Sequence, residues 1–233
     1  MNRLQSLFWF RWQYLITNKV LLFVCVVTPF LDFLILQTIP FIHGEIFFLN
    51  IGLDLVYSLT AGSFTSLMVS EEKEKKMLRT LILTGVTRTE YILSTLAFPF
   101  FFSALTAISM PIFFGIHIQQ FTIYCLVVMM TSLIFILINL LIGLFAKTQV
   151  HASLFSMLVL LIATFLPMIA IDNSNSFLFH ITQYSFIGAN TEFLTRPDSF
   201  TITSSSMIAT IFWVICLIIL THYAFKWNGK DHS

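Results

Sequence analysis

Long apolar runs separated by short polar stretches dominate the chain. A helix needs about 20 mostly apolar residues to cross a bilayer's hydrocarbon core. Six segments reach that length: 20–42, 49–70, 91–115, 121–146, 150–171 and 207–226. None shows the alternation over about ten residues that marks strands of a membrane β-barrel. The pattern predicts an all-α membrane protein with six transmembrane helices, forming one domain over residues 1–233.

Composition supports the membrane prediction and argues against a soluble globular domain. Hydrophobic residues make up 58% of the chain and charged residues 10%, with a mean hydropathy of +0.90. A soluble domain carries about 25% charged residues. Cys25, Cys125 and Cys216 each lie within a separate apolar run and show no C-x-x-C spacing. They are interpreted as membrane-embedded apolar side chains, so the sequence predicts no metal site.

The basic residues predict how the chain is oriented in the cell membrane. With six spans, 11 of the 12 Lys and Arg residues fall on one side, and only Arg196 falls on the other. Because short cytoplasmic loops are enriched in Lys and Arg, both termini are predicted to be cytoplasmic.

Two segments outside the spans are also predicted to be helical. Residues 1–18 carry an apolar stripe with Arg3 and Arg11 placed elsewhere, which predicts an amphipathic helix in the cytoplasmic interface. The stripe consists of Leu4, Leu7, Phe8, Trp12 and Leu15. An alternative is that this segment extends the first span into the headgroups. The longest external connection, 172–206, is rich in Phe, Ser and Thr, and is expected either to form short re-entrant-like helices or to be an ordinary surface loop.

The charged loop 71–90, between the second and third spans, carries the most specific pattern. Glu71 and Lys75, and likewise Glu72 and Lys76, have the i,i+4 spacing and order that stabilise a helix. Gly85 is expected to end that helix, and Thr87-x-x-Glu90 has the spacing of a capping box that opens the third span.

At these residues the chain resembles the ABC-2 family of ABC-transporter permeases. That family carries an E-K-E-R-G-T-like run after its second span, then a few apolar residues and a P-V-S-R-like turn. The counterparts here are Glu72-Lys73-Glu74-Lys75 and Gly85-Val86-Thr87-Arg88. Lys76-Met77 replaces Gly-Thr and Gly85 replaces the proline, and these departures keep the charge pattern and the spacing. The resemblance also covers the six-span layout, the N-terminal helix and the external segment.

The resemblance implies that the loop is a coupling helix that contacts a cytoplasmic ABC ATPase. It also implies a complex of two ATPases and two permeases, the second permease being another copy or a paralogue. The chain has no G-x-x-x-x-G-K-[ST] phosphate loop. We therefore expect this chain to bind no cofactor and the partner to hold ATP and Mg²⁺. The predicted coupling residues are Glu71, Glu72, Lys73, Glu74, Lys75, Arg79, Gly85, Arg88 and Glu90. The alternative is a solvated charged loop that contacts no partner.

Among the polar residues inside the predicted spans, the candidates for lining a translocation path are Asp32, Asp54 and Asn139. Charged groups in hydrocarbon cost several kcal/mol, so intramembrane acids are candidates for function. Asp32 and Asp54 are hypothesised to line a translocation path, or else to be protonated or water-reached acids bonded to polar neighbours. Asn139 is interpreted chiefly as an interhelical hydrogen-bonding residue.

These features predict a non-catalytic permease subunit that moves an amphipathic substrate out of the cell while a separate ATPase hydrolyses ATP. Similarity to small exporters of phenol-soluble modulin-type peptides favours a membrane-active peptide as substrate, whereas drug, lipid or polysaccharide export remains an alternative. Membrane lipid is an expected partner and nucleic acid is not. An intramembrane aspartyl protease using Asp32 and Asp54 is the alternative from a different functional class.

Overall fold

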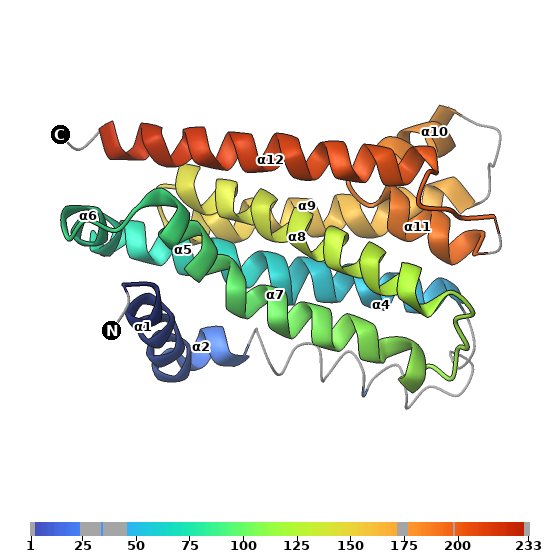
Figure 1. Cartoon of the computed structure of the whole chain (residues 1–233), viewed down its shortest axis with the longest axis horizontal. Helices are drawn as coiled ribbons and strands as arrows, with labels where there is room; N and C mark the ends of the chain where they lie inside the picture. Colours follow the sequence, from blue (N-terminus) through green and yellow to red (C-terminus); the bar gives the residue numbers. More distant parts are fainter. Residues whose placement is uncertain (1–2, 24–33, 35–45, 172–176, 198, 231–233) are drawn as a thin grey trace.

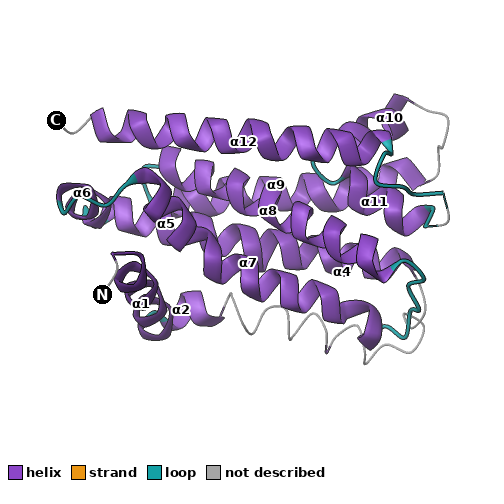
Figure 2. Cartoon of the chain, in the orientation of Figure 1, coloured by secondary structure: helices purple, strands orange, loops and turns teal. Residues whose placement is uncertain are grey.

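Long helices packed side by side form the computed structural model, which describes residues 3–23, 34, 46–171, 177–197 and 199–230 (Figure 1). All regular secondary structure in these ranges is helical, which confirms the all-α prediction for this part of the chain (Figure 2). Five helices are long and apolar enough to cross a membrane. Most of the predicted first span, 20–42, lies outside the described residues. The same is true of Asp32 and Cys25.

The five spanning helices begin and end close to the predicted positions. The second predicted span is one continuous helix, Ile46–Glu74, composed of α4 (Ile46–Leu55), η3 (Val56–Ser63) and α5 (Phe64–Glu74). The other spanning helices are α7 (Arg88–Phe113), α8 (Phe121–Phe145), α9 (Gln149–Ile171) and α12 (Ser205–Lys230). Before them come α1 (Arg3–Thr17) and the short α2 (Lys19–Leu22).

The middle of the Ile46–Glu74 helix is wound as a π-helix over eight residues, Val56–Ser63. The Phe64 N–H donates to the carbonyl of Leu59, five residues earlier, instead of to the residue four earlier. The wider winding is uncommon and usually interrupts an α-helix for about one turn. It changes which side chains of α4 and of α5 share a face, and so sets the polar contacts described below.

Helix α8 forms the centre of the bundle. It packs against η3, α5, α7 and α12, and Val127, Ile134, Phe135 and Ile136 are fully buried. By contrast, only 22% of the apolar window of α9 is buried inside the bundle. The outward face of α9 exposes Leu154, Phe155 and Leu158, as expected of a helix in contact with lipid.

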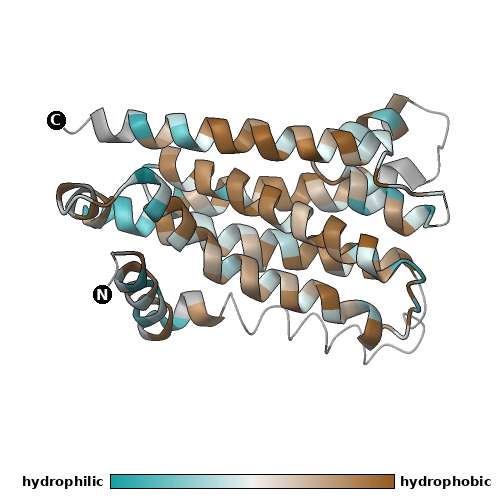
Figure 3. Cartoon of the chain, in the orientation of Figure 1, coloured by the Kyte–Doolittle hydropathy of each residue, from teal (hydrophilic) through white to brown (hydrophobic). Residues whose placement is uncertain are grey.

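The two ends of the bundle differ in structure. One end, here called the α6 end, carries α1, the short helix α6 (Met77–Leu83) and the last turns of α12 (Figure 1). Polar residues concentrate on α5, α1 and the last turns of α12 at this end, and apolar residues fill the middle of the bundle (Figure 3). The opposite end, here called the α11 end, carries α10 (Phe177–Tyr184) and α11 (Gly188–Thr195).

The segment expected to be re-entrant-like therefore contains two short helices. Ala189, Phe193 and Leu194 of α11 are buried in the same apolar cluster as Leu49 and Tyr124 of the spanning helices. Helix α11 thus packs between the ends of the spans and does not lie on their surface.

Candidate functional site

The charged run Glu71–Glu74 is the last turn of the second spanning helix, and does not form the separate helix that the sequence predicts. Helix α5 ends at Glu74, and Lys76 adopts a left-handed conformation with φ 59°. A new helix, α6, then covers Met77–Leu83. The predicted Glu72–Lys76 pair is therefore wrong, because the chain leaves the helix before Lys76 and because Glu72 is buried.

The other expected features of this loop are present. Gly85 has φ 81°, and the Val86 N–H donates to the Leu81 carbonyl, which is the long hydrogen bond of a Schellman helix end. Thr87 and Glu90 form a complete capping box at the start of α7. Glu71 pairs with Lys75 at 2.5 Å, as the i,i+4 spacing predicts.

Glu72 forms a buried ion pair with Arg11 of the N-terminal helix. The two side chains are 0% and 1% exposed, respectively. Glu72 also accepts a 2.7 Å hydrogen bond from the Tyr91 hydroxyl, and Arg11 donates a 2.9 Å hydrogen bond to Thr95, so the network joins α1, α5 and α7. Arg11 further lies over the Tyr91 ring, 5.1 Å from its centroid.

This placement corrects the expectation that Arg11 lies away from the buried face of the N-terminal helix. The buried positions of α1 are Leu7, Arg11 and Leu15, spaced four residues apart, whereas Trp12 of the predicted apolar stripe is 40% exposed. Burial lowers the pKa of the Arg11 guanidinium from its usual value, and the neighbouring Tyr91 opposes that shift. A guanidinium still remains charged under these conditions, so the pair with Glu72 is ionic.

The other three residues of the run also bind parts of the same chain. The Glu71 carboxylate accepts a 3.0 Å hydrogen bond from Asn18, beside the end of α1. Lys73 donates a 2.6 Å hydrogen bond to the Leu144 carbonyl in the last turn of α8. Glu74 accepts from the Gln149 N–H at the first turn of α9. We call residues 71–74 the charged hub, because they tie α5 to the N-terminal segment and to α7, α8 and α9.

Several predicted coupling residues remain accessible around the hub. The Lys75 side chain is 60% exposed and Gly85 is also exposed, as is Lys76, which is not among the predicted coupling residues. Arg88 is half-buried and lies 3.4 Å from a ring nitrogen of His222. Leu83, at the end of α6, is 77% exposed. The side chain of Arg79 lies outside the described residues.

A second polar network crosses the middle of the bundle. Ser156 of α9 donates to Asn139 of α8 at 2.6 Å and lies 2.6 Å from the hydroxyl of Ser66 in α5. Asn139 packs so closely on Gly62 that a Cβ there would lie 2.5 Å from its amide nitrogen. A Cβ at Gly143 would lie 2.8 Å from Val69. These contacts agree with the interpretation of Asn139 as an interhelical hydrogen-bonding residue, next to a glycine that allows close helix packing.

Asp54 has a different environment, in the last turns of α4. Its side chain is 1% exposed, and neither carboxylate oxygen has a hydrogen-bond partner within the described residues. One turn toward the α11 end, Asn50 accepts a 3.0 Å hydrogen bond from Asn190 of α11. Asn190 in turn accepts from the Tyr57 hydroxyl at 3.3 Å. The structure therefore connects α4 and η3 to α11 through amide and phenol groups, with Asp54 just beneath.

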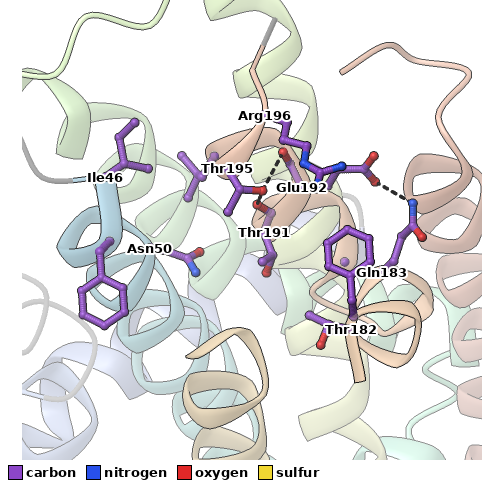
Figure 4. A pocket seen from close by; sticks show the side chains of 12 residues that line it. Ile46, Asn50, Thr182, Gln183, Thr191, Glu192, Thr195 and Arg196 are labelled. Carbon is purple, nitrogen blue, oxygen red and sulfur yellow. Dashed lines mark hydrogen bonds between the residues drawn. The ribbon is translucent and has the colours of Figure 1, made fainter. Parts of the chain in front are cut away.

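A cavity of about 370 Å³ opens at the α11 end, between α4, α10 and α11 (Figure 4). Asn50 and Ile46 lie on its α4 side, and Thr191, Glu192 and Arg196 lie on its α11 side. Arg196 lies over the Phe179 ring at 5.2 Å, and Glu192 accepts a long hydrogen bond from Gln183. The cavity therefore offers an aromatic ring, one acidic group and one basic group to a bound molecule.

Sequence reasoning found the charged run but missed its main partners, Arg11 and Tyr91. Arg11 lies 61 positions before Glu72, and a single arginine on an amphipathic helix normally faces solvent. The pairing of Asn50 with Asn190 is equally remote in sequence. The sequence itself indicated these contacts only through polar residues that interrupt apolar runs, as at Asn50, Asp54 and Asn139. Among the described residues, no three His, Cys, Asp or Glu side chains are grouped as they would need to be to hold a metal ion.

Comparison with known protein families gave a match that covers most of the chain. The family described as "Fluoroquinolones export permease protein Rv2686c-like" matches residues 10–223. Comparisons with curated proteins and with solved structures gave no significant match. The matched range includes Arg11, the charged hub, the polar network of Asn139 and the α11-end cavity.

Proposed function

The chain belongs to the Rv2686c-like family of fluoroquinolone export permeases, an ABC-2 type permease-like family, and from this premise we propose that it is the membrane subunit of an ATP-driven exporter. Its five long apolar helices make it a multi-pass membrane protein, and its family makes it a transport subunit. In this proposal a separate ABC ATPase binds ATP and Mg²⁺ and supplies the energy.

We propose that the ATPase docks on α6 and the turns beside it. The observation that carries this is the structure of the α6 end, where a short helix with a 77% exposed leucine projects from a rigid charged hub. A short amphipathic helix with an apolar anchor suits docking into a groove of another protein. Because Glu71, Glu72, Lys73 and Glu74 are occupied by contacts within the chain, their role here is to hold α6 in place. Lys75, Arg88 and Leu83 are the side chains offered to the partner.

The α6 end is cytoplasmic in this proposal, since its exposed basic side chains fit the side of the membrane that favours them. The exported molecule then leaves at the α11 end. Each assembly is proposed to contain two ATPases and two permeases, and the second permease is either another copy of the chain or a paralogue.

We propose that the substrate is an amphipathic aromatic small molecule. The family description names fluoroquinolones, and the α11-end cavity of about 370 Å³ combines an aromatic ring with one acidic and one basic group. The size lies within the range of small-molecule sites. The sequence similarity to exporters of membrane-active peptides has no support from the family match, and a peptide substrate is the alternative that the transport experiment tests.

Two measurements test the proposal. First, the chain is isolated from its native membranes, and an ABC ATPase is expected to co-purify with it. Leu83→Asp should reduce the recovered ATPase at least tenfold, whereas Ile202→Asp, the same change at a 54% exposed site on the α11 end, should not. Equal recovery with both variants would place the docking surface elsewhere.

Second, cells that express the chain with its ATPase are expected to accumulate less of a fluorescent fluoroquinolone than cells with a hydrolysis-deficient ATPase. Protection against a membrane-active peptide with unchanged fluoroquinolone accumulation would contradict the small-molecule proposal and favour the peptide. Activity that persists without any ATPase would contradict the ABC mechanism altogether.

A further inference from the structure

Asp54 is the one described acidic side chain within the span of the bundle that has no partner at all. Its carboxyl group is 1% exposed, and neither oxygen has a hydrogen-bond partner in the part of the chain that the structure describes. The two ion pairs in the described residues, Arg11–Glu72 and Lys75–Glu71, lie at the α6 end. An ionised carboxylate in such a place would lose its hydration without gaining a countercharge, which is strongly unfavourable. A neutral carboxyl group avoids most of that cost.

Three hydroxyl groups near the depth of Asp54 are also buried without a hydrogen-bond partner among the described residues. Ser58 lies four residues further on in the same helix. Thr131 and Ser132 belong to α8. Contacts between α8 and the helix α4–η3–α5 show that these groups lie at a similar depth in the bundle.

Helices α8 and α4–η3–α5 run in the same direction, and three contacts fix their alignment. Tyr57 stacks on Phe135 with ring centroids 5.6 Å apart. Gly62 lies against Asn139. A Cβ at Gly143 would lie 3.0 Å from the Ser66 carbonyl. In these three contacts the residue number in α8 is about 77 higher than the number of its partner in α4–η3–α5. The contacting pairs are 57–135, 62–139 and 66–143. The same offset places Asp54 at the depth of Thr131 and Ser132.

A neutral carboxyl group fits this set of hydroxyls chemically. It has one O–H donor and a carbonyl acceptor, and each hydroxyl can accept one bond and donate another. The phenols nearest to this region are Tyr57 and Tyr124, and both act as donors: Tyr57 to Asn190 and Tyr124 to the Ala107 carbonyl at 2.6 Å. The other described charged or titratable groups toward the α11 end belong to α10, α11 and the turn after it, the turn between α7 and α8, and the start of α8. They are His180, Tyr184, Glu192, Arg196, His117 and Cys125. No described Lys or Arg faces Asp54 from α7, α8, α9 or α11.

We propose that Asp54 is an intramembrane proton-binding site, occupied while α11 packs against α4 and emptied when that packing opens. The Asn50–Asn190–Tyr57 contacts separate Asp54 from the α11-end cavity, because Asn50 lines the cavity and Asp54 follows one turn deeper. Water that passes these contacts would hydrate the carboxylate and allow the proton to leave. Opening of the α11 end is thereby linked to pH, independently of which molecule is exported.

The test uses the full chain, purified in lipid bilayers, and requires no transport. Infrared spectra are recorded from pH 5 to pH 9 for the native chain, for Asp54→Asn and for Glu192→Gln. The native chain is expected to show a protonated-carboxyl band at pH 8 that Asp54→Asn lacks and Glu192→Gln retains. Absence of that band from the native chain at pH 8, or its persistence in Asp54→Asn, would overturn the proposal.

Thermal unfolding of the same samples gives a second readout. A carboxyl group that stays neutral in the folded chain still ionises in the unfolded chain above a pH of about 4. Folding therefore becomes less favourable as the pH rises, and the folding equilibrium constant falls by up to about tenfold for each pH unit. Asp54→Asn cannot ionise, so its stability relative to the native chain should grow from pH 5 to pH 8. A difference that does not change with pH would overturn the proposal. A native chain stabilised by Na⁺ at pH 8, with no protonated band, would instead indicate a bound metal cation and would also overturn it.

Discussion

The buried pair of Arg11 and Glu72 gives the sharpest prediction about how the α6 end is held together. Removing one partner leaves the other charge buried: Glu72→Gln leaves the Arg11 guanidinium 1% exposed, with a single remaining hydrogen bond to Thr95. Breaking a buried ion pair from one side costs about 3–5 kcal/mol. At about 2–4 °C per kcal/mol for a chain of this size, the apparent melting temperature should fall by roughly 6–20 °C.

The double variant distinguishes pairing from simple packing. Arg11→Met with Glu72→Gln removes both charges and keeps an acceptor for the Tyr91 hydroxyl. We expect a coupling energy of about 2–3 kcal/mol, so that the double variant loses about that much less stability than the sum of the two single losses. Tyr91→Phe is a control with a smaller expected loss of stability. It removes one hydrogen bond to a charged group, worth about 1.5–3 kcal/mol, and leaves the ion pair in place.

Thermal unfolding followed by tryptophan fluorescence, in one fixed lipid composition, measures the native chain, the two single variants, the double variant and Tyr91→Phe. Trp9 and Trp12 lie on α1, so their emission also reports whether the N-terminal helix remains docked. If the single losses simply add in the double variant, Arg11 and Glu72 do not act as a pair and the reasoning is refuted.

Three further substitutions test other contacts. Gly62→Ala places a Cβ 2.5 Å from the Asn139 amide and should cost about 1–3 kcal/mol by overpacking. Partial recovery of the melting temperature on adding Asn139→Ala would confirm that this contact is the cause, and no recovery would exclude it. Gly188→Ala places a Cβ 2.1 Å from the Gln183 carbonyl and should speed limited proteolysis of the connection that contains α10 and α11; an unchanged cleavage rate would contradict this. Thr87→Ala removes the helix cap and should cost about 1 kcal/mol in thermal unfolding, whereas Thr87→Ser should cost much less.

The spanning helices were predictable because their physical cause is local. A run such as 121–146 must be long and apolar to cross hydrocarbon, and α8 covers Phe121–Phe145. The capping box of Thr87 and Glu90 was equally predictable, since both partners lie within one helical turn. The six-span count stays a prediction, because the first span lies largely outside the described residues.

The partners of the polar residues were not predictable, because they are set by packing between distant segments. The pattern of Glu72 and Lys76 favours a surface pair worth a few tenths of a kcal/mol. A buried carboxylate with a guanidinium and a phenol against it is a much stronger arrangement, and the chain adopts it by bringing α1 onto α5 and α7. Nothing in the spacing of residues 56–63 distinguishes a π-helix from an α-helix either.

The π-helical turns of Val56–Ser63 have a consequence for how sequences of this kind vary. A π-helical turn holds more residues than an α-helical turn, so removing one residue would let this segment rewind as an α-helix and change the rotation of α5 relative to α4. Glu72 would then no longer point toward Arg11, nor Gly62 toward Asn139. A homologue with a one-residue gap here would need to rebuild both contacts. We therefore expect the length of this stretch to be preserved more strictly than its residues.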